Sequence, residues 1–402
     1  MSAEIAPRPV RTVPCFTSGV FALLAVVAVG GIFAAWRLIS GLSAVTNLSD
    51  QYPWGLWIAV DVATGVALAA GGFTTGALAY VFGGERYRAV VRSALLTAML
   101  GYTFVAVGLL VDLGRPYAIW HPMIYWQGNS VLFEVGICVM SYLAVLYLEF
   151  LPIVVERYKD GVALPRPFTA LGRPIHSALT LTGRVMDRAL PFLILAGVVL
   201  SCLHQSSLGT LMLIAPTKMH ALWFTPISPL LFLMSAIAVG YPMVIVESMI
   251  ASRSLKLEPE MDVLGPLARF IPVFLGLYLA MKVGDMSIRG TWRHLVGGSP
   301  VAPWFAAEMI GGVATPLFML LFRRVRRSPP LLFAAALMVV LGVALNRLNV
   351  FLVAYSPPFA AKAYFPSPGE IAVTAALIST LVLAYRFTVM NFPVIAGRSR
   401  AS

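Results

Sequence analysis

Charged residues are scarce in this chain of 402 residues, since Asp, Glu, Lys and Arg make up 11% of the sequence and hydrophobic residues make up 59%. Soluble globular domains carry about 25% charged residues. The composition therefore excludes a soluble globular domain and indicates a membrane protein with several spanning helices.

Cysteine and histidine are scarce as well, with three and five residues. Cys15, Cys138 and Cys202 show no metal-ligand spacing, and two of them lie inside apolar segments, so we expect neither a disulfide framework nor an iron-sulfur cluster. His204 is the one histidine well inside an apolar segment, whereas a haem with two histidine ligands needs two that face each other. We therefore expect no haem in this chain.

Long apolar runs, in contrast, are frequent. A helix that spans a bilayer needs about 20 mostly apolar residues. Ten segments meet that length, at residues 18–40, 54–82, 89–111, 130–155, 189–214, 221–250, 263–284, 302–322, 330–353 and 370–390. We predict an all-α polytopic membrane protein with ten transmembrane helices, numbered as spans 1 to 10. Span 1 is longer than the apolar run of a signal peptide and lacks a small-residue cleavage site, so we expect it to be retained.

The formal net charge of +12 could reflect nucleic-acid binding, but the basic residues lie in short loops between apolar runs. Membrane topology is the better explanation. Most of the 29 Lys and Arg residues fall on the cytoplasmic side if the N-terminus is cytoplasmic, so we expect both termini there and no nucleic-acid partner. We expect the basic segment from Arg157 to Arg188 to be a long loop between two bundles, where anionic lipid explains its charge.

Four consecutive polar residues, His204 to Ser207, interrupt span 5 near the middle of the membrane. Asp61 in span 2 and Glu134 in span 4 lie in the outer half. An ionisable group in a bilayer costs about 2.5–3.5 kcal/mol on insertion scales, so it must face protein or water and suggests a functional cavity. Quinone reduction needs hydrogen-bond donors and a proton relay, which these groups would supply. The alternative is a buried polar network that holds helices together.

Other polar residues extend this candidate site. We add Gln205, Trp57 in span 2, and Asp112, Arg115 and His121 at the outer end of span 3 to the residues that would bind or protonate a quinone. Aromatic side chains at this depth are often membrane-interface anchors, and Asp112 with Arg115 could instead form a helix-end ion pair.

A proton path is a second hypothesis, with polar residues of several spans as candidates: Glu149, Glu247, Asp285, Glu308 and Arg347. Solvated helix ends explain Glu149 and Glu247 almost as well. Glu308 and Arg347 could form a buried ion pair in which packing, and not transport, is the role.

Polar residues recur at similar depths in two halves of the chain. Spans 2–5 carry Asp112, Glu134 and His204, and spans 6–9 carry Asp285, Glu308 and Asn346-Arg347. The pattern predicts two parallel copies of a four-helix bundle, with spans 1 and 10 as one peripheral helix at each end. The predicted boundaries are 1–46, 47–215, 216–355 and 356–402. We place the quinone site in the first bundle, because the histidine occurs there.

Several segments together resemble a known family: Asp112-Leu113-Gly114-Arg115-Pro116, Trp120-His121, Glu134, and Leu203-His204-Gln205-Ser206-Ser207-Leu208-Gly209. With ten spans, the chain resembles the NrfD/polysulfide reductase membrane-subunit family, in particular its HybB-like Ni/Fe-hydrogenase "cytochrome b" branch. The resemblance covers nearly the whole chain, and the L-H-Q-S-S-L-G element is its most specific part.

This resemblance implies two four-helix bundles and a menaquinone or ubiquinone site toward the periplasmic side of a bacterial inner membrane, without haem. It implies a periplasmic ferredoxin-like iron-sulfur subunit that links the chain to the hydrogenase large and small subunits or to another catalytic module. It leaves open whether quinone chemistry is coupled to proton translocation.

Our leading hypothesis is a quinone-reactive membrane subunit of a respiratory oxidoreductase that is not catalytic alone. The same type of subunit could serve a sulfur-metabolising or multihaem cytochrome complex. Secondary transporters also combine repeats with polar residues at mid-membrane, but the sequence shows no clearly broken helices at matching positions. Pro226 and Pro229 in span 6 keep that alternative open. A passive membrane anchor is a third possibility, in which Asp61, Glu134 and His204 would be dispensable.

Overall fold

The computed structural model describes residues 7–10, 13–159, 172–360 and 362–395. These residues are helical apart from their loops and one isolated bridge between Met219 and Tyr355. The predicted all-α polytopic class is confirmed, because ten of the described helices are long and apolar enough to cross a membrane. They are Ser18–Ser40, Trp57–Val81, Glu85–Asp112, Val131–Tyr158, Pro174–Ile214, Ser228–Ser254, Met261–Arg289, Ala302–Leu321, Pro329–Val353 and Pro368–Asn391.

Two of these spans are built from short segments that include π-helix. Span 2 consists of η2 (Trp57–Thr64), α2 (Gly65–Leu68), α3 (Gly71–Gly76) and η3 (Ala77–Val81). Span 8 consists of α11 (Ala302–Ala306), η10 (Ala307–Ala314) and α12 (Thr315–Leu321). The segments η2, η3 and η10 are π-helical. Such turns are rare and frequently occur at functional sites.

The other spans are more regular, and their main helices are α1 (Ser18–Ser40), α4 (Arg88–Asp112), α5 (Val131–Tyr158), α6 (Gly172–Thr210), α7 (Ser228–Ser254), α8 (Met261–Leu267) with α9 (Ile271–Arg289), α14 (Pro329–Leu348) with the π-helical η11 (Asn349–Val353), and α15 (Pro368–Asn391). The short helices α10 (Arg293–Val296) and α13 (Arg323–Arg327) lie between spans.

Spans 2–5 pack against one another in a closed ring, through α3 with α4, α4 with α5, α5 with α6, and α6 with α3. Spans 6–9 form a second ring, through α7 with α9, α9 with α12, η10 with α14, and α14 with α7. We call these the first and second rings. Spans 2, 5, 6 and 9 also pack across the two rings, so the predicted division into separate bundles at residue 215 stays a prediction.

Close helix crossings depend on glycine. A Cβ added at Gly342 would lie 2.3 Å from the Cα of Gly312, so α14 and η10 touch through their backbones. A Cβ at Gly71 would lie 3.0 Å from Val244 and 3.1 Å from the carbonyl oxygen of Gly240, which brings span 2 against α7. Small residues permit such approaches in membrane helices, where close packing replaces the hydrophobic driving force.

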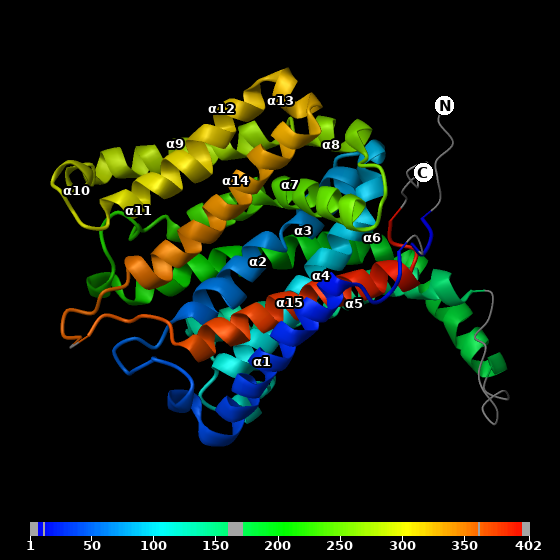
Figure 1. Cartoon of the computed structure of the whole chain (residues 1–402), viewed down its shortest axis with the longest axis horizontal. Helices are drawn as coiled ribbons and strands as arrows, with labels where there is room; N and C mark the ends of the chain where they lie inside the picture. The colour runs from blue at the N-terminus through cyan, green and yellow to red at the C-terminus, as the bar shows by residue number, and fades with distance from the viewer. Residues whose placement is uncertain (1–6, 11–12, 160–171, 361, 396–402) are drawn as a thin grey trace.

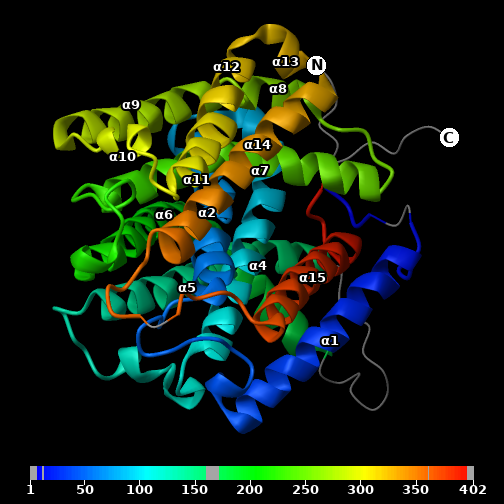
Figure 2. The same cartoon turned by 60° about the vertical axis from the view of Figure 1, so that its left-hand side comes forward.

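The first and last spans, predicted as one peripheral helix at each end, lie side by side (Figures 1 and 2). Helix α1 packs along α15, and Gly30 permits it, because an added Cβ there would lie 2.4 Å from the carbonyl oxygen of Ala372. Helix α15 in turn packs on α4 and η2. The described segments nearest the two termini meet at one end of the molecule, where the backbone amide of Val10 donates to the carbonyl oxygen of Val389 at 3.1 Å. We call this the terminal end and the opposite one the far end.

The prediction of a long loop from Arg157 to Arg188 was wrong in part, because helices cover much of this segment. Helix α5 continues to Tyr158 and α6 begins at Gly172, while residues 160–171 lie outside the described residues. The first turns of α6 extend away from the other helices (Figure 1). Charged residues such as Arg184 and Asp187 lower the hydropathy of this stretch, which hid an amphipathic helical continuation of span 5.

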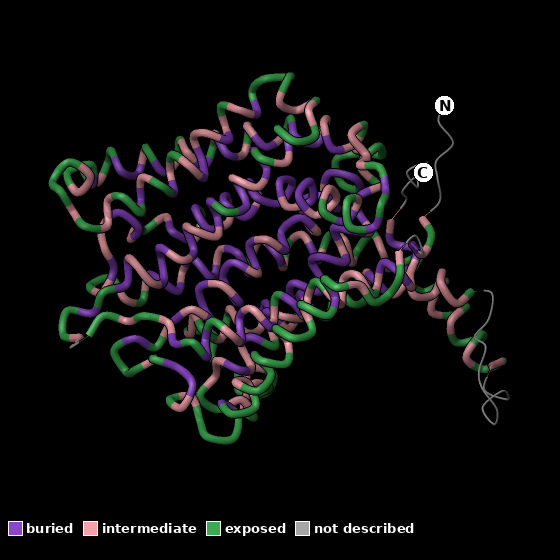
Figure 3. Tube along the Cα trace, viewed as in Figure 1, coloured by how far each residue is buried: buried purple, intermediate pink, exposed green. Residues whose placement is uncertain are grey.

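Burial is greatest where the two rings meet. In the most apolar stretch of span 2, 78% of the residues are buried, and in that of span 6, 72%, against 11% in span 1. Figure 3 shows the buried residues concentrated along the central helices and the exposed ones along α1 and the loops. Because spans 2 and 6 have little contact with lipid, polar side chains on them face protein.

Candidate functional site

His204 is completely buried in the first ring. Its Nδ1 lies 3.1 Å from the hydroxyl oxygen of Tyr102 on α4, and its Nε2 has no hydrogen-bond partner among the described residues. The neighbouring Gln205 is also completely buried. Its amide nitrogen donates to the carbonyl oxygen of Val66 in span 2 at 2.8 Å, and its Oε1 has no described partner. Two unpaired polar atoms therefore lie in one turn of α6.

A chain of aromatic contacts leads from His204 to a cavity. The ring of Tyr102 lies edge-on to that of Tyr142 on α5, with centroids 4.6 Å apart. Tyr142 lines a cavity of about 120 Å³ between spans 2, 3, 4 and 5, and Glu149 lines the same cavity. A Cβ added at Gly197 of α6 would lie 2.8 Å from Glu149 and 3.6 Å from Tyr142. A titratable carboxyl, two phenols and an imidazole thus follow one another through the first ring.

Asp61 has different neighbours from those predicted. Its Oδ2 accepts a hydrogen bond from Thr374 of α15 at 2.7 Å, and Gly108 of α4 leaves room for it, since a Cβ there would lie 3.0 Å from the Cβ of Asp61. Among the described residues Asp61 and His204 share no hydrogen-bond partner. The sequence could not reveal that span 10 contributes to this position, because Thr374 lies 313 residues away in the chain.

Trp57 also binds span 10, because its indole nitrogen donates to the carbonyl oxygen of Glu370 at 3.1 Å. The Glu370 side chain closes a capping box with Ser367 at the start of α15 and accepts from the amide of Asn47 at 3.1 Å. Tyr364 donates a short hydrogen bond to the same carboxylate. Trp57 therefore helps to fix the position of α15.

The remaining predicted quinone residues lie at the far end. The Asp112–Arg115 ion pair, the alternative to a quinone role, is absent from the described ion pairs, and Arg37 of α1 is the cation that acts on Asp112. The Arg37 guanidinium donates to the carbonyl oxygen of Leu113, which ends α4. Arg115 is exposed.

Glu134 and His121 are exposed too. Glu134 lies in the first turn of α5, where a carboxylate is stabilised by the helix dipole. His121 stacks edge-on against Trp120 with centroids 4.5 Å apart and against Tyr125 at 5.1 Å. The loop after α4 thus presents exposed aromatic side chains at the far end, while Glu134 has no contact that joins it to His204 in the described residues.

The second ring holds a buried network around Glu308. Its Oε1 accepts from the amide of Asn346 at 2.8 Å, and its Oε2 accepts from Trp223 at 2.9 Å and Asn349 at 2.8 Å. Arg347 donates to the Oδ1 of Asn346 at 2.5 Å. The predicted direct Glu308–Arg347 ion pair was therefore wrong, since the asparagine lies between the two charges. The Gly312–Gly342 crossing, one turn away, brings the helices close enough for this contact.

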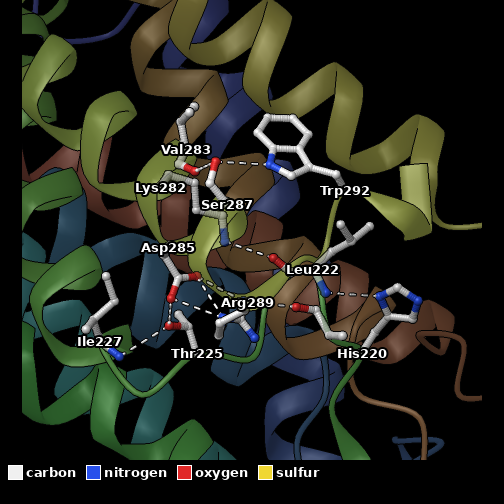
Figure 4. Close-up of polar contacts among 11 residues, drawn as sticks. His220, Leu222, Thr225, Ile227, Lys282, Val283, Asp285, Ser287, Arg289 and Trp292 are labelled. Carbon is white, nitrogen blue, oxygen red and sulfur yellow. Dashed lines mark hydrogen bonds and ion pairs between the residues drawn. The ribbon is translucent and has the colours of Figure 1, made fainter. Parts of the chain in front are cut away.

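A second cation and the Asp285 cluster complete this network (Figure 4). Buried Lys282 donates to the carbonyl oxygen of Leu222 at 2.9 Å, and it interacts electrostatically with both Glu308 and Asp285. Arg289 forms an ion pair with Asp285 at 2.9 Å. Asp285 also accepts from the hydroxyl of Thr225 at 2.6 Å. Both oxygens of Glu308 and both oxygens of Asp285 thus accept from donors.

His220 lies at the edge of that cluster, in the loop before α7. Its Nδ1 accepts from the amide of Leu222 at 3.3 Å, and its ring is edge-on to His294 with centroids 5.3 Å apart. Burial, and next the charge of His294, lower the pKa of His220 below the ordinary 6.5. The neutral ring is therefore favoured at neutral pH.

Glu247, the last predicted proton-path residue, lies between α7 and α15. One carboxyl oxygen accepts from Tyr385 of α15 at 2.8 Å, and the other has no described partner. Glu247 does not line the cavity that contains Glu149. The structure therefore joins Glu308, Arg347 and Asp285 through shared neighbours, and it places Glu149 and Glu247 separately.

Some members of these clusters were missed from the sequence. Lys282 lies inside predicted span 7, so the same rule that selected Asp61 would have found it. Tyr102, Tyr142 and Trp223 carry no comparable signal, because aromatic residues are frequent in spanning helices. Within the described residues no group of three or more His, Cys, Asp or Glu is placed to hold a metal ion.

Comparison with known proteins agrees with this architecture. Residues 44–357, which include spans 2–9, match the family model described as polysulphide reductase, NrfD. The chain is 38% identical over 380 residues to a protein of Nitratidesulfovibrio vulgaris, with 92% of each chain covered. It is 31% identical over 366 residues to the probable Ni/Fe-hydrogenase 2 b-type cytochrome subunit of Escherichia coli K12, covering 89% of this chain and 88% of that protein.

A more distant relative widens the comparison. The menaquinone reductase integral membrane subunit of Nitratidesulfovibrio vulgaris is 24% identical over 386 residues, covering 89% of this chain and 88% of that protein. The similarity therefore covers about nine tenths of this chain in each case. This chain belongs to the NrfD polysulphide reductase family of multi-pass membrane proteins.

Proposed function

We propose that this chain is the quinone-reactive membrane subunit of a respiratory oxidoreductase and that it exchanges electrons between an iron-sulfur partner and the quinone pool. Two relatives are a probable hydrogenase subunit and a menaquinone reductase subunit, which supports both the type of complex and the quinone. The observation that carries the choice of site is the buried, unpaired Nε2 of His204.

The unpaired atoms fit a quinone. Reduction of a quinone takes up two electrons and two protons and yields a quinol. The His204 Nε2 can donate to a carbonyl oxygen, and the Oε1 of Gln205 can accept from a quinol hydroxyl. Both atoms are buried without a described partner, and a buried polar atom favours a ligand that supplies its missing hydrogen bond. We therefore assign quinone binding to the first ring and expect Asp61 to act on it only indirectly.

A proton route to His204 follows from the same contacts. Glu149 lines the cavity on the terminal side of Tyr142, and Tyr102 joins Tyr142 to His204. We propose that protons enter through this cavity and reach the imidazole through the two phenols, which makes Glu149 the entry group. Glu308 and Asp285 of the second ring accept from donors on both oxygens, which fits structural support better than proton transfer.

The electron donor must be another subunit, because we expect no haem or cluster in this chain. Basic residues are frequent in the loops of the terminal end, which by the positive-inside rule supports a cytoplasmic position for that end in a bacterium. The far end, with exposed Trp120, Tyr125 and Trp126, faces the periplasm. A ferredoxin-like iron-sulfur subunit of a hydrogenase, or of another catalytic module, would dock there.

The test uses the complex that co-purifies with this chain. We expect His204→Ala to lower donor-dependent reduction of a quinone analogue by at least about 100-fold, the ordinary contribution of a general acid or base. Reduction of a viologen dye by the catalytic module reports intact assembly. His176→Ala, an exposed histidine on the same helix, is the matched control. Equal quinone reduction by the two variants would contradict the proposal.

A secondary transporter is the second candidate, and span 2 favours it, since its π-helical segments and the turn at Ala69-Ala70 make it irregular. Pro226 and Pro229 do not break span 6, because α7 begins at Ser228. A transporter would move solute into vesicles that contain the isolated chain. Absence of quinone-dependent electron transfer together with solute uptake would favour this candidate.

A further inference from the structure

A basic groove of about 420 Å³ lies at the terminal end of the second ring, apart from the proposed quinone site. Five arginines and one acidic residue line it, from three segments that are distant in sequence: Arg86, Asp262, Arg269, Arg323, Arg326 and Arg327. Helix α8 packs on both α13 and the turn η4 (Glu85–Tyr87), which brings these segments together.

The five arginines of this groove carry more charge than its one acidic residue, Asp262, can balance. The ion pairs of the described residues involve Arg88, Arg92 and Arg289, none of which lines the groove. Arg326 is used structurally, because its guanidinium donates to the carbonyl oxygens of Leu320 and Leu321 at the end of α12. Burial, and next the nearby Arg269 and Arg323, lower the pKa of Arg326. The cations therefore repel one another without a bound anion.

Exposed apolar side chains lie at the end of α12, next in sequence to the arginines of α13. Helix α12 ends at Leu321, directly before the arginine run, and Phe318, Leu321 and Phe322 are 61%, 56% and 66% exposed. An anion that brings its own hydrocarbon chains would cover these side chains while its phosphate met the arginines. A free phosphate would leave them uncovered.

We propose that this groove binds the headgroup of an anionic phospholipid. Arg269, Arg323 and Arg327 hold the phosphate, and the acyl chains lie along the exposed face of α12. Guanidinium groups suit phosphate oxygens because their donors bind two oxygens at once. Bound lipid would tie Arg269, which follows α8, to α13, and so fix the terminal end of the second ring.

The experiment compares two double variants of the full chain, purified with its partner subunits. Arg323→Gln with Arg327→Gln removes two groove cations. Arg324→Gln with Arg253→Gln removes two exposed cations of the same end that do not line the groove. Mass spectrometry counts the cardiolipin and phosphatidylglycerol that co-purify. We expect the groove variant to bind anionic lipid about 30-fold more weakly, the loss typical of two arginines near an anionic headgroup, and the control variant to bind as the natural protein does.

A second measurement covers the case in which the groove variant does not fold. The natural protein is placed in nanodiscs of phosphatidylcholine, with or without 10% cardiolipin, and its thermal unfolding is followed. A rise in Tm with cardiolipin, absent with millimolar inorganic phosphate, supports the proposal. Equal lipid retention by both double variants, an equal rise with phosphate alone, or no rise with cardiolipin would each overturn it.

Discussion

The two rings bury polar side chains at similar depths but use them differently. In the first ring, His204 keeps one bond, to Tyr102, and its Nε2 and the Oε1 of Gln205 are unpaired. In the second ring, both oxygens of Glu308 and both polar atoms of Asn346 are occupied, and the unpaired atoms of this network are the Nε of Arg347 and the Oδ1 of Asn349.

This difference distinguishes a ligand-binding site from a network that only holds helices together. Buried networks whose members are satisfied rigidify a core, because every group would lose a partner if the helices moved. Unpaired buried atoms have a cost that a ligand can remove. The first ring also has the cavity at Glu149, whereas the space beside Arg347 measures about 10 Å³, roughly one water molecule. The comparison therefore assigns chemistry to the first ring and structural support to the second.

Glu308→Ala should have the largest effect, and it tests whether the second ring has a structural role. Loss of this carboxylate leaves Arg347 and Lys282 buried without their shared counter-charge, and removal of one partner from such a pair costs about 3–5 kcal/mol. We therefore expect a large fall in the Tm of the purified complex. Glu258→Ala, at an exposed glutamate, should leave Tm unchanged. Normal stability with loss of quinone activity would reverse the roles of the two rings.

Gly342→Leu should have the next largest effect. Its Cβ would lie 2.3 Å from the Cα of Gly312, so α14 and η10 must separate, and overpacking of this kind costs about 1–3 kcal/mol. The separation would also lengthen the Asn346–Glu308 contact. Gly311→Leu is the control, because nothing lies within 4 Å of a Cβ there. Equal Tm values for the two variants would show that the crossing does not hold the network together.

Tyr102→Phe tests the proposed relay of protons to His204 in the first ring. The variant keeps the ring packed on Tyr142 but removes the hydroxyl bonded to His204. We expect quinone reduction to fall about 10-fold, since one hydrogen bond contributes about 1 kcal/mol and the relay is interrupted, while Tm changes little. Tyr147→Phe, which removes an exposed hydroxyl of α5 that bonds to Thr103 of α4, is the matched control. Unchanged quinone kinetics in Tyr102→Phe would argue against the relay.

The smallest expected effect is a pH dependence at the far end of the second ring. The pKa of His220 is lowered in the folded protein, so the unfolded chain binds the proton more readily. The stability from His220 is therefore present above pH 6.5 and is lost as the pH falls below that value. Thermal unfolding at pH 7 and pH 5 should show a smaller loss for His220→Gln than for the natural protein. An equal loss in both would assign the acid sensitivity to other groups.

The fold followed from the sequence because span length and hydropathy depend on the residues themselves. All ten spans were predicted, and most ends differ by a few residues. The errors have local causes: α7 begins only at Ser228, with Pro226 before it and Pro229 in its first turn, and the charges near Arg184 hid the first turns of α6. The pairing of α1 with α15 could not be predicted, because nothing in either sequence identifies its partner.

The site was predictable only as a set of unusual residues. The cost of burying charge selected His204, Gln205, Glu308 and Arg347, and all four are buried. Depth alone also grouped Asp61 with His204, although Asp61 bonds to Thr374 of span 10. Which side of a helix a residue faces depends on the helices around it, and the π-helical turns of span 2 shift that face further.

Photolabelling with an azido-quinone analogue tests the central claim most directly. The complex would be labelled in native membranes, digested, and mapped by mass spectrometry, with excess unlabelled menaquinone as competitor. We predict competable label on first-ring peptides near Val66, Tyr102 and His204, and its loss in His204→Ala. Competable label confined to the second-ring peptides that contain Glu308 or Arg347 would contradict the account.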